Sequence, residues 1–146
     1  MNRFIRLFGG VLAVTVTSVT SATIVSPIDI ICPIDGERFQ AMSMLSLFRM
    51  GTYLDLMPQS TYGGPPPLPK CPSNGLVLYR TEFSADQLTR LKRYVTTRKY
   101  QTLQSTHADY YVAAQIQRYL GESPEIIANS LLHSTAQAKD RAQYLL

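Results

Sequence analysis

Two short segments with the same pattern constrain this chain more than any other feature of its sequence. Each begins with Cys-Pro and ends with Asp-Gly or Asn-Gly; the first spans residues 32–36 and the second spans residues 71–75. Asp-Gly and Asn-Gly are strong signals for tight turns, because such turns require a positive φ. The chain therefore turns sharply at both places, and we expect short strands at residues 38–42, within 48–56 and at 76–79.

The two turns are similar to a pair of zinc knuckles of the form Cys-Pro-x-Cys-Gly, but each keeps only its first cysteine. Cys32 and Cys71 are present, whereas Asp35 and Asn74 stand at the second ligand position of each knuckle. Structural zinc sites normally use four ligands, and of the two replacements only Asp35 is a credible one. Weak zinc binding therefore stays open as an alternative, and we assign neither a metal site nor a cofactor.

A disulfide is the stronger expectation for these cysteines. In a four-ligand knuckle site the two first-position sulfurs lie within a few ångströms of each other, and such a pair oxidises outside the cytoplasm. A bond between Cys32 and Cys71 would close a loop of about 40 residues and stabilise the protein by ~4 kcal/mol. Free or redox-active thiols are the remaining alternative, although the chain has no Cys-x-x-Cys sequence.

The compartment follows from the N-terminus. Arg3 and Arg6 precede residues 7–28, which carry no charge, and small residues at positions 20–22 offer a cleavage site. This pattern predicts a secretory signal peptide over residues 1–22, with an uncleaved membrane anchor as the alternative. Either arrangement places the remaining chain outside the cytoplasm, in the periplasm or secreted. Cleavage would leave no transmembrane span and would lower the formal net charge from +4 to +2, which argues against nucleic acid as a partner.

Helical patterns replace strand patterns in the second half of the chain. The sequence Ser84-Ala85-Asp86-Gln87 matches a capping box, and helical periodicity continues from there to about residue 97. A second helix is expected from a cap at Thr106 to Leu120, and a third over residues 123–139, so that these two form an αα-hairpin.

These elements together predict an α+β fold. A small antiparallel β-rich head with two cysteines would occupy residues 23–82, and a helical tail packed on the head would occupy residues 83–146. The run of prolines at residues 65–67 cannot be helix or central strand. It predicts a stiff connector within the head, with exposed polyproline recognition by an SH3-like partner as the alternative.

A cluster of basic residues lies in and around the first predicted helix. Tyrosines at positions 79, 94 and 100 are interleaved with the basic residues, which are Arg80, Arg90, Lys92, Arg93, Arg98 and Lys99. On a helix, Arg90 and Arg93 share a face opposite the apolar stripe. An ordinary solvated helix face is one interpretation. The other is contact with an anionic surface such as lipid headgroups or wall polymer, made by Arg90, Lys92, Arg93, Arg98 and Lys99.

Catalytic patterns are missing from the sequence. It contains no Gly-x-Ser-x-Gly, no His-Glu-x-x-His and no phosphate-cradling loop, and its only histidines are His107 and His133. We therefore expect a non-enzymatic protein, an envelope interaction or scaffolding module whose partner is another envelope protein or an anionic surface. The alternative is a cell-envelope hydrolase that uses carboxylates such as Asp35 and Asp55. The oligomeric state does not follow from the sequence.

Four motifs carry a resemblance to a known family. The pattern Cys32-Pro-Ile-Asp-Gly, Gly51-x-x-Leu54-Asp55-x-x-Pro58, Pro69-x-Cys71-Pro72-x-x-Gly75 and Arg118-x-Leu120-Gly121 resembles an uncharacterised bacterial family over about residues 30–140. Proteins of that family have a zinc-knuckle-like head and a tetratricopeptide-like helical tail. The resemblance implies an interaction surface on the tail but no activity. Metal binding does not carry over, because the second ligand of each knuckle is missing here. A single helical hairpin must pack on the head or on a partner.

Overall fold

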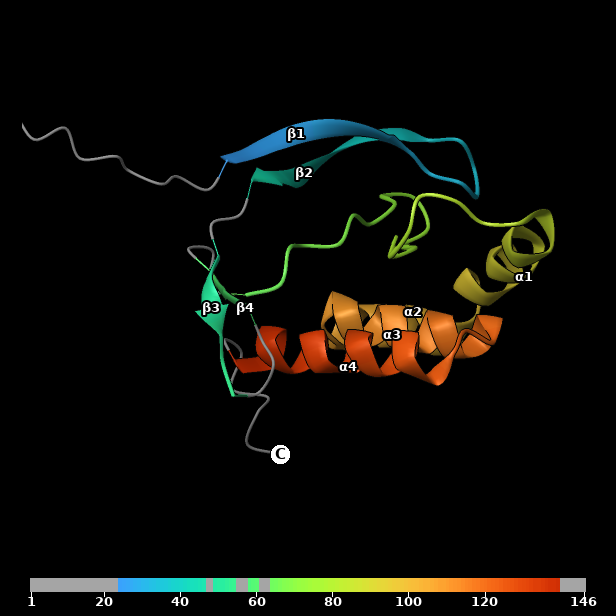
Figure 1. Ribbon diagram of the computed structural model, residues 1–146. Coiled ribbons are helices and arrows are strands. Elements are labelled where there is room, and N and C mark those ends of the chain that lie inside the picture. The colour runs from blue at the N-terminus through green and yellow to red at the C-terminus, as the bar shows by residue number, and fades with distance from the viewer. Residues whose placement is uncertain (1–23, 47–48, 55–57, 61–63, 140–146) are drawn as a thin grey trace, which may run out of the picture.

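The computed structural model of the protein describes residues 24–46, 49–54, 58–60 and 64–139. The predicted signal peptide lies outside these ranges, so it stays a prediction. Within them, two antiparallel sheets of two strands each precede four helices, which confirms the predicted α+β fold with a β head and a helical tail (Figure 1). The elements are β1 (Ile24–Ile31), β2 (Arg38–Ser46), β3 (Arg49–Thr52), β4 (Pro58–Ser60), α1 (Ala85–Val95), α2 (Arg98–Thr106), α3 (Asp109–Leu120) and α4 (Pro124–Lys139).

The first Cys-Pro turn closes a long hairpin made of β1 and β2. The register runs from the pair Ile24–Ser46 at the open end to the pair Ile31–Arg38 beside the turn. The strand expected at residues 38–42 is therefore present and continues to Ser46. β1 consists of the residues that lead directly into Cys32. The strand expected within residues 48–56 corresponds to β3, which pairs with β4.

The strand expected at residues 76–79 does not form. Within the described residues, this segment forms one isolated antiparallel bridge, between Lys70 and Val77. The Val77 N–H instead donates to the hydroxyl of Tyr100, at 3.3 Å. A side chain of α2, rather than a neighbouring strand, therefore accepts the Val77 N–H. The four consecutive apolar residues at 76–79 are explained by burial against the helices.

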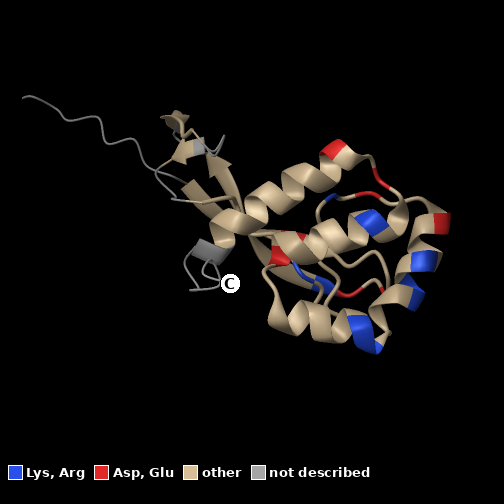
Figure 2. Cartoon of the chain, turned by 90° about the horizontal axis from the view of Figure 1, so that it is seen from below, with Lys and Arg blue, Asp and Glu red and all other residues tan. Residues whose placement is uncertain are grey.

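The helical tail begins as predicted. The Ser84 hydroxyl accepts the Gln87 N–H at 3.3 Å, and the Gln87 side chain accepts the Ser84 N–H at 3.0 Å, which completes a capping box at the start of α1. In the αα-hairpin of α3 and α4, Gly121 terminates α3 with a φ of 80°. α3 and α4 lie side by side in both views of the chain (Figures 1 and 2).

One helix was not expected. α2 begins after Thr97, whose hydroxyl accepts the Tyr100 N–H at 3.2 Å. Thr106, predicted to cap the next helix, is instead the last residue of α2, and α3 begins after Ala108 without a side-chain cap. The short helix matters because it carries Tyr100 toward the second Cys-Pro turn.

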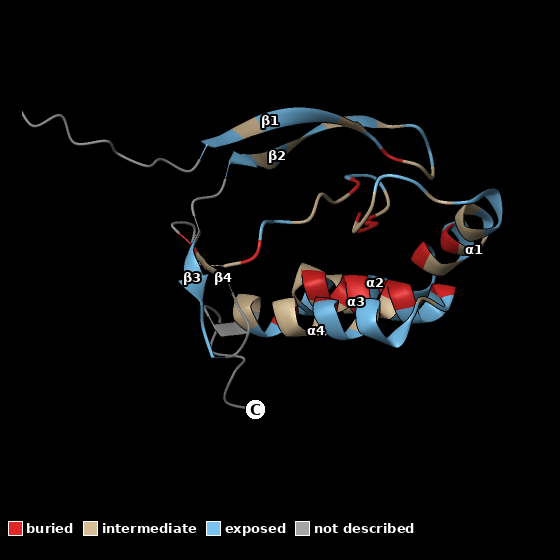
Figure 3. Cartoon of the chain, viewed as in Figure 1, coloured by how far each residue is buried: buried red, intermediate tan, exposed pale blue. Residues whose placement is uncertain are grey.

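A single hydrophobic core joins the head to the tail. It contains both cysteines, the three residues after the second turn, and apolar residues of α1, α2 and α3 (Figure 3): Cys32, Cys71, Leu76, Val77, Leu78, Leu91, Val95, Tyr100, Val112, Ala113, Ile116 and Leu120. Residues on both sides of the predicted boundary at residues 82–83 thus contribute to the same core. The apolar face of the helices is covered by the second turn. Among the described residues, no helix combines the length and the hydropathy needed to cross a bilayer.

Candidate functional site

The two Cys-Pro turns have the same backbone structure. In the first, the Gly36 N–H donates to the Cys32 carbonyl at 2.9 Å; in the second, the Gly75 N–H donates to the Cys71 carbonyl at 2.9 Å. Each cysteine N–H in turn donates to the carbonyl of the residue after the glycine, at 2.8 and 2.9 Å. The two glycines have φ values of 79° and 73°, a region that favours glycine. The repeated sequence pattern therefore encodes a repeated structure.

A disulfide joins the two turns, as predicted. Cys32 and Cys71 are bonded to each other with their Cα atoms 5.6 Å apart, and both are fully buried. This separation lies in the ordinary range for a disulfide. Because the sulfurs are bonded to each other, neither is a thiolate ligand for a metal in this form.

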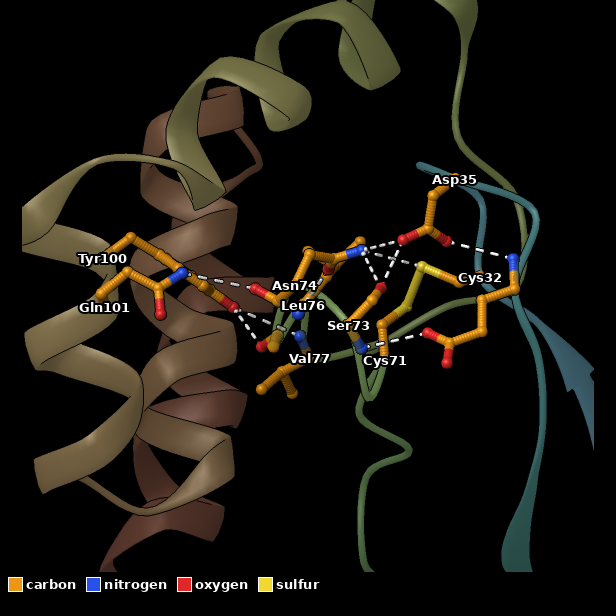
Figure 4. Close-up of a disulfide and its surroundings, with 11 residues drawn as sticks. Cys32, Asp35, Cys71, Ser73, Asn74, Leu76, Val77, Tyr100 and Gln101 are labelled. Carbon is orange, nitrogen blue, oxygen red and sulfur yellow. Dashed lines mark hydrogen bonds between the residues drawn. A yellow bond between two sulfur atoms is a disulfide. The ribbon is translucent and has the colours of Figure 1, made fainter.

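Asp35 and Asn74, which stand where a zinc knuckle has its second ligand, hydrogen-bond to the backbone. Asp35 Oδ1 accepts the Glu37 N–H at 3.1 Å, and Asn74 Oδ1 accepts the Leu76 N–H at 2.9 Å. Both bonds span two residues, the pattern by which Asp and Asn side chains stabilise turns. The Asn74 side-chain N–H also donates to Cys32 Sγ at 3.3 Å. Asp35 and Asn74 thus hold the turns in shape around the disulfide (Figure 4).

Polar contacts also link one turn directly to the other. Asp35 Oδ2 accepts a hydrogen bond from the Ser73 hydroxyl and another from the Asn74 side chain, the latter at 2.9 Å. The Ser73 N–H donates to the Glu37 carboxylate at 3.0 Å. The Ser73 hydroxyl, together with the Glu37 N–H, lowers the pKa of the Asp35 carboxyl below its usual value. Asp35 is therefore an ionised acceptor that bridges the two turns.

The basic residues separate into two groups. Arg80 forms an ion pair with Glu122 at 2.9 Å, and its guanidinium lies 4.7 Å from the centre of the Phe83 ring. Arg90 donates to the carbonyls of Tyr119 and Leu120 at the end of α3. A cation at this place interacts favourably with the C-terminal end of a helix. Both arginines are thus engaged in contacts that connect α1 and its preceding loop to the end of α3 and the loop after it.

The sequence places Arg90 and Arg93 on one helix face opposite the apolar stripe, and of the two only Arg93 is exposed. Arg90 is half-buried and lies over the Tyr119 ring at 5.2 Å, because α3 packs beside α1. The other four residues of the cluster are exposed: Lys92 and Arg93 in the last turn of α1, and Arg98 and Lys99 in the first turn of α2. We call these four residues the α1–α2 corner. Figure 2 shows basic residues along α1 and at the adjoining end of α2.

Two of the three interleaved tyrosines are structural. Tyr100 is fully buried, and Tyr79 donates its hydroxyl to the Glu122 carboxylate at 3.0 Å. Burial raises the pKa of both hydroxyls, so they stay protonated. Tyr94 stacks on Tyr119 with ring centres 4.2 Å apart and lies partly exposed beside the α1–α2 corner.

The two histidines contact adjacent tyrosines at the start of α3. His107 is exposed and stacks on Tyr111 with ring centres 4.7 Å apart, and His133 lies beside Tyr110 with ring centres 5.0 Å apart. Asp55 lies outside the described residues. Within residues that the structure describes, no three His, Cys, Asp or Glu side chains are grouped so as to hold a metal ion.

Comparisons with known proteins give no assignment. No known protein family, no curated protein and no solved structure matches this chain. The resemblance to a bacterial family with a zinc-knuckle-like head therefore stays a prediction.

Proposed function

We propose that this protein is an exported, non-enzymatic interaction module that contacts an anionic component of the cell envelope through the α1–α2 corner. The observation that carries the proposal is the exposure of four cations on two consecutive helix ends. Among the described residues, none of the four forms an ion pair. Unpaired cations gathered on one surface produce a positive potential that attracts anionic partners.

The position of Arg98 and Lys99 supports an external anion. Both lie in the first turn of α2, which has no acidic residue. A cation near a helix N-terminus is unfavourable by about 0.3–1 kcal/mol, because the helix dipole is positive there. An anion bound at the corner would interact favourably with both the side chains and the dipole. Arg98 and Lys99 thus lower the stability of the free protein slightly, and this effect favours the binding of an anion.

The head supports export and rigidity. A fully buried disulfide is typical of proteins that fold in an oxidising compartment. Together with Arg3, Arg6 and the uncharged stretch behind them, it favours the periplasm or the exterior. The disulfide and the hydrogen bonds of Asp35 between the two turns also stabilise the part of the head against which the helices pack.

The competing proposal of a carboxylate hydrolase has less support. The hydrogen bonds to Asp35 lower its pKa, which argues against Asp35 as the general acid of such an enzyme. Changing Asp35 and Asp55 together to asparagine separates the two proposals. Under the interaction proposal, the doubly changed protein keeps its binding to anionic surfaces.

The test uses cosedimentation of the purified mature protein with vesicles. We expect binding to vesicles of 30% phosphatidylglycerol in phosphatidylcholine at low salt, weaker binding at 0.5 M salt, and none to pure phosphatidylcholine. Linear polyphosphate as a competitor distinguishes a general anion site from one that needs a lipid surface. The double variant Arg93→Glu/Lys99→Glu should bind at least tenfold more weakly.

A matched control changes charge by the same amount elsewhere. Arg38→Glu/Arg118→Glu reverses two exposed cations, one on β2 and one on α3. If this control loses binding as much as Arg93→Glu/Lys99→Glu does, net charge rather than the α1–α2 corner is responsible. If neither double variant changes binding, the proposal is wrong.

A further inference from the structure

The second Cys-Pro turn contains the one Asn-Gly pair of the sequence, Asn74-Gly75. In such a pair the backbone nitrogen of the glycine can attack the asparagine side chain, because glycine has no side chain that blocks the approach. The turn nevertheless needs glycine here. Gly75 has a φ of 73°, and a Cβ at this position would come within 2.7 Å of the Gln104 side chain. The fold therefore requires the residue that makes Asn74 chemically labile.

Hydrogen bonds hold both reacting groups while the head is closed, by which we mean that the two cysteines are bonded. The Gly75 N–H donates to the Cys71 carbonyl at 2.9 Å, and the Gly75 carbonyl accepts the Tyr100 hydroxyl at 2.8 Å. Asn74 Oδ1 accepts the Leu76 N–H at 2.9 Å. A backbone nitrogen becomes nucleophilic only when it gives up its proton, and Gly75 is buried with its proton held by a carbonyl. The reaction therefore needs the turn to open first.

The first turn holds the Asn74 amide from across the disulfide. The amide nitrogen donates to Asp35 Oδ2 at 2.9 Å and to Cys32 Sγ at 3.3 Å, and a third acceptor is Ser73 Oγ at 3.2 Å (Figure 4). Two of these three acceptors belong to the first turn, which the Cys32–Cys71 bond keeps beside the second. When this bond is reduced, no covalent link keeps those acceptors near the amide. The disulfide therefore controls how firmly the Asn74 side chain is held.

We propose that Asn74 is a deamidation site that is protected while Cys32 and Cys71 are bonded and reactive when both are thiols. The thiol form is the chain before oxidation, or the product of exchange with a dithiol reductant. The Gly75 nitrogen then forms a bond to Asn74 Cγ, and Nδ2 leaves as ammonia together with the proton of the Gly75 nitrogen. The resulting cyclic imide adds water, which gives aspartate or isoaspartate. Neither of these steps consumes an oxidant or a reductant.

The product does not restore the closed head. A carboxylate at position 74 has no N–H group for Asp35 or for the Cys32 sulfur. It also places a second negative charge beside Asp35, whose pKa is lowered so that this carboxyl is ionised. Isoaspartate in addition lengthens the main chain by one carbon atom within the turn. A chain that stays reduced until Asn74 reacts is therefore prevented from closing its head again.

The test follows deamidation of the mature protein by peptide mapping with mass spectrometry. Oxidised protein and protein kept in a dithiol reductant are incubated side by side at mildly alkaline pH. A synthetic peptide of residues 69–79 gives the rate of an unprotected Asn-Gly pair. The contribution of the bond to stability corresponds to a change of up to about a thousandfold in how often the head opens. We expect Asn74 to react faster in the reduced than in the oxidised protein by a factor of about ten or more, and the peptide to react faster than the oxidised protein by a similar factor.

The sequence supplies an internal control. Apart from Asn2 in the predicted signal peptide, Asn129 is the other asparagine of the chain; it is exposed on α4 and is followed by serine. Its conversion should stay slow in both forms. Equal rates at Asn74 in the oxidised and reduced protein would overturn the proposal. Equal conversion of Asn74 and Asn129 in the reduced protein would overturn it as well.

A pair of variants tests whether the modification keeps the head open. Asn74→Asp reproduces the direct product, and Asn129→Asp adds the same charge on α4. Each reduced protein is returned to a glutathione redox buffer, and the ratio of disulfide to thiol form is measured at equilibrium. Wild type and Asn129→Asp should re-form the bond equally, whereas this ratio should be lower in Asn74→Asp by a factor of about ten or more. If Asn74→Asp re-forms the disulfide as well as wild type does, the proposed block on closing is wrong.

Discussion

Removing the hydroxyl of Tyr100 tests whether α2 is what holds the second Cys-Pro turn. Tyr100 is fully buried, and its hydroxyl donates to the Gly75 carbonyl at 2.8 Å and accepts the Val77 N–H at 3.3 Å. Phenylalanine keeps the ring, including its edge-on contact with Tyr94 at 5.1 Å. The change therefore removes two hydrogen bonds without creating a large cavity.

The magnitude follows from the two groups that are left behind. A buried donor or acceptor without a partner costs about 1–3 kcal/mol, and the longer of the two bonds contributes at the lower end of that range. We expect Tyr100→Phe to lower the free energy of unfolding by about 2–3 kcal/mol. For a domain of this size each kcal/mol shifts Tm by about 3–5 °C. Tm should therefore fall by about 6–15 °C.

The assay is urea unfolding followed by circular dichroism, with the disulfide kept oxidised. The matched control is Tyr53→Phe, because Tyr53 is 54% exposed and its substitution should change stability by less than about 0.5 kcal/mol. The slope of the unfolding curve should stay the same in both variants. If Tyr100→Phe lowers the free energy of unfolding by less than about 0.5 kcal/mol, the Tyr100 hydroxyl does not anchor the second turn to α2.

Two further predictions concern the link between the turns. Reducing the Cys32–Cys71 bond opens a loop with a sequence separation of 39 residues, and the free energy of unfolding should fall by ~4 kcal/mol; an unchanged urea midpoint with reductant would contradict this. Hydrogen bonds lower the pKa of folded Asp35 below 3.8, so its contribution to stability is present above that pH and is lost as the pH falls through the lowered value. Tm of the wild type should therefore fall more steeply below pH 4 than Tm of Asp35→Asn, and parallel Tm profiles would exclude this role.

Local sequence patterns predicted the parts of the fold that local physics decides. The two turns, the capping box at Ser84 and the left-handed Gly121 depend on residues within four or five positions of one another. The disulfide was also predictable, because the repeated turn pattern placed two cysteines in equivalent positions. Asp35 and Asn74 were singled out correctly as turn residues, although their hydrogen bonds across the disulfide needed the structure.

The errors arise where partners are distant in sequence. Residues 76–79 have the composition of a strand, but helices cover them and the Val77 N–H donates to the Tyr100 hydroxyl. Residues 98–106 have little apolar periodicity, so α2 was missed; the threonine at position 97 was the available signal. Helical periodicity placed Arg90 opposite the apolar stripe of α1. Periodicity cannot show that the end of α3 lies beside this residue.

The separation of roles between the disulfide and its neighbours explains how the head holds its shape. One covalent bond between two turns fixes their distance but leaves rotation about the bond, whereas four metal ligands would fix both. Here Asp35, Glu37 and Ser73 supply the additional contacts that set the orientation of one turn relative to the other. The first turn determines where β2 begins, and the second follows directly after Lys70. The hydrogen bonds of Asp35, Glu37 and Ser73 therefore fix how β2 is oriented relative to the segment that ends at Lys70.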